Sequence, residues 1–126
     1  SFSIDELRAS QQDAKAGDVV RFSVEVTNTG PVAGAEVVQL YVSYPGSAVE
    51  RSERDLKGFA KVTLDPGESR TVVIDLPVNS LAYYDVSESA WVLEALEHGI
   101  HVGTSSRDLP LSETLRLEAQ RPVALY

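Results

Sequence analysis

The sequence predicts an all-β protein, a sandwich or barrel built from at least seven short strands. Apolar and polar residues alternate strictly over several segments, which is the pattern of half-buried strands. Clusters rich in Gly, Pro, Asn and Asp separate these segments, as expected for turns. No long segment shows the 3.6-residue period of an amphipathic helix.

Two strands are predicted in the first half of the chain, over residues 20–27 and 35–44. Alternation groups their apolar side chains on common faces: Val20, Phe22, Val24 and Val26 in the first strand, and Val38, Leu40 and Val42 in the second. A turn cluster begins at Asn28, and only residues 28–34 connect the strands. We therefore expect these two strands to be neighbours.

The second half continues the pattern of short strands and turns. The turn at residues 65–68 is marked by Pro66, which presets its geometry, and Gly67. Further strands are expected at residues 59–64, 69–76, 90–93, 98–102 and 111–117, the last at a sheet edge, with a tight segment at 81–85 and a strand or lead-in at 2–7.

The 126 residues fit one domain. We expect residues 1–18 to form a lead-in strand and loop, residues 19–117 the sandwich, and residues 118–126 a tail. The sequence contains no methionine. This suggests a fragment, a processed chain or one piece of a cleaved precursor.

The charge balance argues against nucleic acid and membrane partners. The formal net charge is -8, whereas binding phosphates requires clustered Lys and Arg. Arg51 and Arg54 lie close together, but Glu50, Glu53 and Asp55 interleave with them, which is typical of a solvated mixed-charge loop. No apolar run approaches the ~20 residues that cross a membrane.

No residue pattern in the chain predicts catalysis, a metal or a cofactor. There is no cysteine, no Gly-rich phosphate loop and no nucleophile motif. His98 and His101 are three residues apart in a predicted strand, so their side chains point to opposite faces and do not share a metal. The carboxylates lie in loops or on outward strand positions, and none is singled out as a catalytic pair.

Three aromatic residues, Tyr83, Tyr84 and Trp91, allow two interpretations. Aromatic side chains can form a platform that binds sugars. A β-sandwich also uses Trp and Tyr in its core, at its corners and at domain interfaces. We favour the second role and keep these three residues as candidate sugar contacts.

Several segments in order resemble the fibronectin type III-like domain that closes many family 3 glycoside hydrolases. These are VEVTNTG at 24–30, AGAEVVQLYV at 33–42, DLKGFAKV at 55–62, LDPGES at 64–69, LAYYD at 81–85, AWV at 90–92 and GTSSRD at 103–108. Each segment alone is weakly specific, but their order covers nearly the whole chain. The resemblance implies an immunoglobulin/fibronectin type III-like antiparallel β-sandwich of seven or eight strands.

The resemblance also implies a function and its partners. In that family the domain follows a catalytic barrel and an α/β sandwich domain, which hydrolyse β-glucosides with retention. The barrel's nucleophile motif has no match here, so the chain itself is expected to be non-catalytic and to stabilise the catalytic domains, on the same precursor or a separate chain. A periplasmic or secreted location is favoured, although the lack of cysteine does not fix the compartment.

Two departures from the family pattern affect packing. Residues 94–99 replace the usual Pro-Gly turn after Trp-Val, and Arg51-Ser52 replaces Arg-Pro before the Leu-Lys-Gly-Phe segment. The candidate surface for the partner domain contains four residues: Arg51, Arg54, Leu56 and Phe59. Phe59 lies off the Ala60 face and could anchor that contact. The alternatives are a free-standing carbohydrate-binding or adhesion module, and a structural adaptor.

Overall fold

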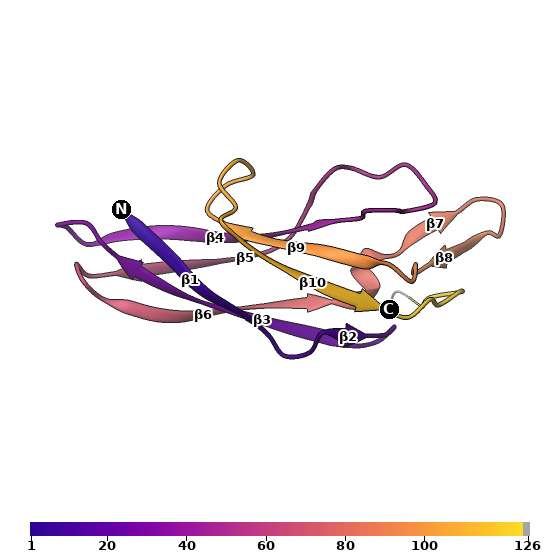
Figure 1. Ribbon diagram of the computed structural model, residues 1–126, viewed down its shortest axis with the longest axis horizontal. Helices are drawn as coiled ribbons and strands as arrows, with labels where there is room; N and C mark the ends of the chain where they lie inside the picture. The colour runs from indigo at the N-terminus through magenta and orange to yellow at the C-terminus, as the bar shows by residue number, and fades with distance from the viewer. Residues whose placement is uncertain (125–126) are drawn as a thin grey trace.

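The computed structural model describes residues 1–124 and shows two β-sheets packed face to face (Figure 1). One sheet has the strand order β1-β3-β6 and the other β2-β10-β9-β4-β5, while β7 and β8 form a separate hairpin at one end. The element bounds are β1 Phe2–Ala9, β2 Asp13–Ala14, β3 Val19–Asn28, β4 Gly34–Ser43, β5 Asp55–Leu64, β6 Ser69–Pro77, the 3-10 helix η1 Val78–Leu81, β7 Tyr83–Asp85, β8 Ala90–Val92, β9 Glu97–Gly103 and β10 Leu111–Leu117.

The predicted β-sandwich is confirmed, with ten strands in the described chain rather than seven or eight. The additional strands are β2 and β7, which have two and three residues, whereas β8 lies within the strand expected at residues 90–93. Such segments are too short to show a period-two pattern. Residues 1–18 include β1 and β2, which pair with β3 and β10 respectively.

The alternation seen in the sequence places the core between the two sheets. The predicted inward residues of β3 and β4 are buried, including Phe22 and Leu40, and so are alternate residues of β6, including Leu76. Their neighbours along each strand face outward, as the pleat requires. Gly58 of β5 also belongs to the inner face, where a Cβ would lie 2.5 Å from Ile74 Cγ2 of β6. This glycine therefore lets the two sheets approach each other closely.

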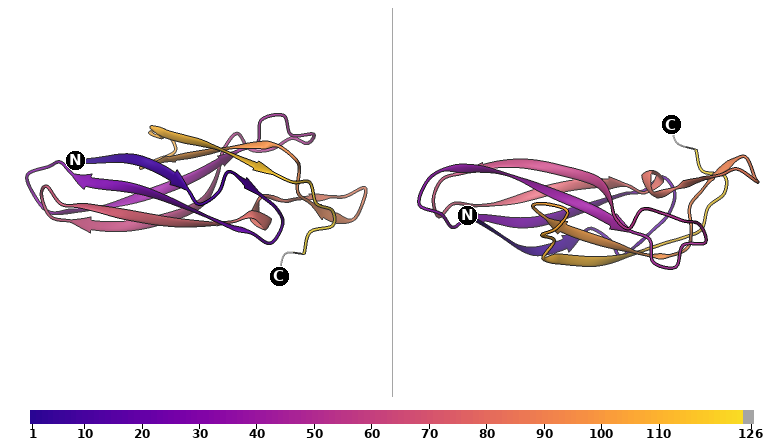
Figure 2. Two further views of the ribbon diagram at one scale, coloured as in Figure 1. Left: turned by 60° about the horizontal axis from the view of Figure 1, so that its bottom comes forward. Right: turned by 90° about the horizontal axis from the view of Figure 1, so that it is seen from above.

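The prediction that the strands at 20–27 and 35–44 are neighbours is wrong. β3 pairs with β1 and β6 in the three-stranded sheet, whereas β4 pairs with β5 and β9 in the five-stranded sheet. The connection at residues 28–34 crosses from one sheet to the other instead of closing a hairpin (Figure 2).

Asn28, which is 1% exposed, explains why the chain crosses here. Its side-chain amide donates to the carbonyl oxygens of Val32 and Leu64 at 2.9 and 3.0 Å, and its Oδ1 accepts from Gly30 N at 2.9 Å. The Asn28 backbone N–H also donates to the Glu68 carbonyl oxygen. One buried side chain thus ties the β3–β4 crossing to the β5–β6 turn, because a buried amide needs all these partners.

The last strand and the C-terminal segment cover one end of the sandwich. β10 pairs antiparallel with β9, and its end pairs in parallel with the two residues of β2, so the predicted edge strand has a short neighbour. Residues 120–124 lie beside the hairpin end, where Gln120 bridges to Leu93 and Val123 is buried. Residues 125–126 of the predicted tail lie outside the described residues.

Candidate domain interface

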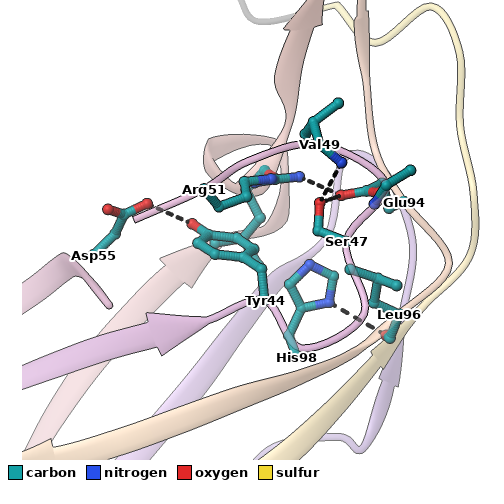
Figure 3. A network of polar contacts seen from close by, with 10 residues as sticks. Tyr44, Ser47, Val49, Arg51, Asp55, Glu94, Leu96 and His98 are labelled. Atoms are coloured by element: carbon teal, nitrogen blue, oxygen red, sulfur yellow. Dashed lines mark hydrogen bonds and ion pairs between the residues drawn. The ribbon is translucent and has the colours of Figure 1, made fainter. Parts of the chain in front are cut away.

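A buried ion pair joins the β4–β5 loop to the segment that follows β8 (Figure 3). Arg51 Nη2 lies 2.7 Å from Glu94 Oε1, and the two side chains are 11% and 9% exposed. Glu94 also accepts from Ser47 Oγ at 2.6 Å and from Ala48 N at 2.8 Å. These donors keep the pKa of Glu94 below its usual value despite its partial burial, which acts in the opposite direction. The Glu94 carboxylate therefore binds three residues of the β4–β5 loop.

The Arg51 guanidinium contacts four groups of the same chain: Glu94, Leu81, Tyr44 and Tyr83. It donates to the carbonyl oxygen of Leu81, the last residue of η1, at 3.1 Å. It lies over the Tyr44 ring at 4.1 Å and over the Tyr83 ring at 5.0 Å, measured to the ring centroids. Arg51 was expected in a solvated loop facing a partner domain, but its charge is used to hold this loop against the hairpin.

Tyr44 and His98 extend the cluster into the core. The Tyr44 hydroxyl donates to Asp55 Oδ2 at 2.9 Å, and burial together with this carboxylate raises the pKa of Tyr44. The Tyr44 ring contacts the His98 ring edge-on at 5.5 Å. In residues 1–124, two buried side-chain atoms have no hydrogen-bond partner, Arg51 Nε and His98 Nε2. Both atoms belong to this cluster.

The two histidines point to opposite faces of β9, as predicted. His98 is fully buried, and its Nδ1 lies 3.2 Å from the Leu96 carbonyl oxygen. His101 lies on the outer face, where its Nε2 is 2.9 Å from Ser43 Oγ. Within the described chain, no group of three or more His, Asp or Glu residues is placed to hold a metal ion.

We expect the domain to lose stability as the pH falls below about 6.5, because His98 is buried as a neutral ring. Burial lowers the pKa of His98, and Arg51 lowers it further. The unfolded chain therefore binds a proton at a higher pH than the folded chain does, and acid favours unfolding. Urea unfolding between pH 7.5 and 5.5 measures the slope.

The matched variants for this pH dependence are His98→Leu and His101→Gln. His98→Leu should flatten the slope, because it removes the buried group that titrates. His101→Gln should retain most of the slope, because His101 is only partly buried. An unchanged slope in His98→Leu would contradict the assignment.

Three of the four predicted interface residues are exposed on or beside β5. Arg54 is exposed just before the strand, and Leu56 and Phe59 are 49% and 69% exposed on it. Phe59 pairs with Gln39 and Leu56 with Tyr41 of β4, on the outer face of the five-stranded sheet. β5 is the edge strand of this sheet. The surface formed by Arg54, Leu56 and Phe59 is called the β5 surface below.

The three candidate sugar-contact aromatics do not form one platform. Tyr84 and Trp91 pair across the hairpin with ring centroids 5.4 Å apart and an angle of 74° between the ring planes. Tyr83 points to the other side, where Arg51 covers it. Neither Tyr44 nor Glu94 was among the predicted site residues. The departure from the family pattern at residues 94–99 marks Glu94, and no comparable signal marks Tyr44.

The fold and this cluster together define a two-sheet β-sandwich domain whose buried polar groups serve its own packing. A family model described as the fibronectin type III-like domain matches residues 36–106. The chain belongs to this family. Within the described residues, no helix has the length and apolar character needed to span a membrane.

Relatives of known name match nearly the whole chain but only a small part of their own length. Thermostable beta-glucosidase B of Acetivibrio thermocellus is 40% identical over 118 residues, which is 94% of this chain and 16% of that protein. An exo-alpha-(1->6)-L-arabinopyranosidase of Bifidobacterium breve is 47% identical, over 83% of this chain and 14% of its own. The chain thus spans about one sixth of the length of these relatives.

Solved structures also match nearly the whole chain over a small part of their own length. The beta-D-glucoside glucohydrolase of Trichoderma reesei superposes with a TM-score of 0.86 at 35% identity, over 94% of this chain and 19% of that chain. The GH3 beta-glucosidase of Bifidobacterium adolescentis gives 0.85 at 36% identity, over 100% of this chain and 19% of that chain. The domain therefore has the same fold as one segment of each of these larger enzymes.

Proposed function

We propose that this chain is the non-catalytic β-sandwich domain of a β-glucosidase-type family 3 glycoside hydrolase. Its role is to stabilise the catalytic barrel and the α/β sandwich domain, which hydrolyse terminal β-D-glucosidic bonds with retention. The observation that supports this most is the coverage of the relatives: the chain matches a small segment of several glycosidases along nearly all of its own length. The choice of sugar belongs to the catalytic domains, since one relative is named for an arabinopyranoside.

The test is whether this chain belongs to, or co-purifies with, a larger polypeptide that hydrolyses β-glucosides. Removal of the 126 residues should lower the thermal midpoint of that enzyme, because an apolar interface is exposed. A natural 126-residue protein that acts alone would refute the proposal.

We propose that the β5 surface contacts the catalytic domains. Replacing Phe59 by Ala in the full-length enzyme should lower the stability of the domain contact by about 1–3 kcal/mol, since a central aromatic anchor is lost. The isolated domain should be unaffected, because Phe59 is 69% exposed. Thermal unfolding of both forms measures this. Val73→Ala, at an exposed position of β6 on the other sheet, is the control; equal effects of the two variants would reject the β5 surface.

A further inference from the structure

The β7–β8 hairpin extends from the end of the sandwich (Figures 1 and 2). Several of its apolar side chains are exposed to solvent. Val86, the first residue of its turn, is 82% exposed. Tyr84 and Trp91 behind it are 47% and 39% exposed. A cluster of ordered apolar side chains on a projecting element is typical of a contact surface.

The turn of the hairpin contains several hydrogen bonds between its own residues. Asp85 Oδ1 accepts from Ser87 N at 2.9 Å, from Ser87 Oγ at 2.7 Å and from Glu88 N at 3.3 Å. Ser89 N donates to the Val86 carbonyl oxygen at 3.3 Å, and Ser89 has a φ of 50°. These bonds stabilise the turn conformation in which Val86 is exposed.

The hairpin is also braced by distant parts of the chain. Val123 N donates to the carbonyl oxygen of Trp91 in β8 at 3.0 Å, and Arg121 pairs with Glu88 in the turn. On the other side Arg51 covers Tyr83. A pre-ordered arm loses little conformational entropy when it binds, which favours docking into a fixed recess.

We propose that the β7–β8 hairpin is a docking arm that inserts Val86, Tyr84 and Trp91 into an apolar, basic-rimmed recess on another folded domain of the same polypeptide. This rests on the proposed function. Two observations indicate which kind of surface the hairpin contacts. The relatives carry more than four fifths of their length outside the matching segment. In addition, residues 83–92 contain no basic residue. Glu88 pairs with Arg121, whereas Asp85 has no ion-pair partner within the described residues, so a basic rim would complement the charge of Asp85.

The geometry favours a protein surface over a sugar. The Tyr84 and Trp91 rings meet at 74°, so they offer a wedge and not a flat stacking face. Oδ1 of Asp85, the nearest carboxylate in the turn, already accepts hydrogen bonds from Ser87 and Glu88. A wedge with an apolar tip fits a recess of complementary shape.

The test compares two exposed valines at opposite ends of the sandwich. Val86→Lys and Val86→Asp are made in the full-length polypeptide, with Val32→Lys as the matched control, because Val32 is 71% exposed in the β3–β4 connection. The readout is the rate at which a protease releases the domain from the full-length polypeptide, together with urea unfolding of the isolated chain.

Both Val86 variants should release the domain at least about tenfold faster, with Lys stronger than Asp because the rim is basic, and neither should change unfolding of the isolated chain. Val32→Lys should change neither measurement. Release rates equal to those of Val32→Lys, or an Asp variant that releases faster than the Lys variant, would overturn the proposal. So would calorimetric binding of cello- or xylo-oligosaccharides to the isolated chain that Trp91→Ala abolishes.

The outcomes separate this proposal from the function on which it rests. A β-glucoside-hydrolysing polypeptide that is indifferent to the Val86 variants rejects the docking arm alone. A natural polypeptide without a glycosidase domain rejects both.

Discussion

Replacing Glu94 by Gln should lower the free energy of unfolding of the domain by about 3 kcal/mol, because it leaves a buried guanidinium without its counter-charge. Arg51 and Glu94 are 11% and 9% exposed, so water cannot replace the lost partner easily. Glu94 also receives Ser47 Oγ and Ala48 N, so the β4–β5 loop should loosen with it. Urea unfolding at pH 7 gives the size of the effect.

The chain supplies a matched control for this variant. Arg21 and Asp75 form a pair of similar length, 2.9 Å between Nε and Oδ1, but their side chains are 65% and 47% exposed. Asp75→Asn should therefore cost far less than Glu94→Gln. If Glu94→Gln and Asp75→Asn lower the free energy of unfolding equally, burial of the Arg51–Glu94 pair does not make it more important to stability than an exposed pair.

Replacing Gly103 by Ala should destabilise the domain by about 2–4 kcal/mol, because the added methyl group meets backbone and not a mobile side chain. Gly103 ends β9, and the following loop folds back across it. A Cβ here would overlap the Asp108 carbonyl oxygen and approach Leu109 Cα to 2.7 Å. The loop must then detach, which breaks the bond from Thr104 N to the same carbonyl oxygen.

Gly34→Ala is the control for the glycine prediction. Gly34 also lies at the end of a strand, but a Cβ there would be 3.6 Å from Phe2 Cζ, an ordinary contact. It should change the free energy of unfolding by less than about 1 kcal/mol. Equal losses at the two positions would show that the cost comes from the strand backbone and not from the clash, and hydrogen exchange of residues 104–109 would locate any loosening.

The residues around Gly103 show how far sequence reasoning reached. The segment GTSSRD was recognised by its resemblance to a family motif, and the structure supplies the reason for its first residue: only glycine lets residue 108 lie against β9. Asn28 is a second case. Its place in a turn cluster was evident, but its role in joining two crossings depends on Leu64 and Glu68, which are distant in the sequence.

The candidate interface was only partly predictable. Exposure of Phe59 follows from alternation, because it lies one residue away from the inward Ala60. Burial of Arg51 does not follow, because its partner Glu94 lies 43 residues away in the sequence and no local pattern connects them. The exposure of Val86 likewise does not follow from alternation, because Val86 lies in a turn between two strands of only three residues each.

The fold class and the inward faces of the longer strands follow from the sequence, because burial of alternate residues gives a strand a period of two. The family follows from the ordered motifs that resemble the fibronectin type III-like domain. The pairing of strands within each sheet, the burial of Arg51 against Glu94 and the exposure of individual apolar residues could be learned only from the three-dimensional structure. Sheet pairing and buried ion pairs depend on contacts between distant residues, and local periodicity carries no information about which distant segments meet.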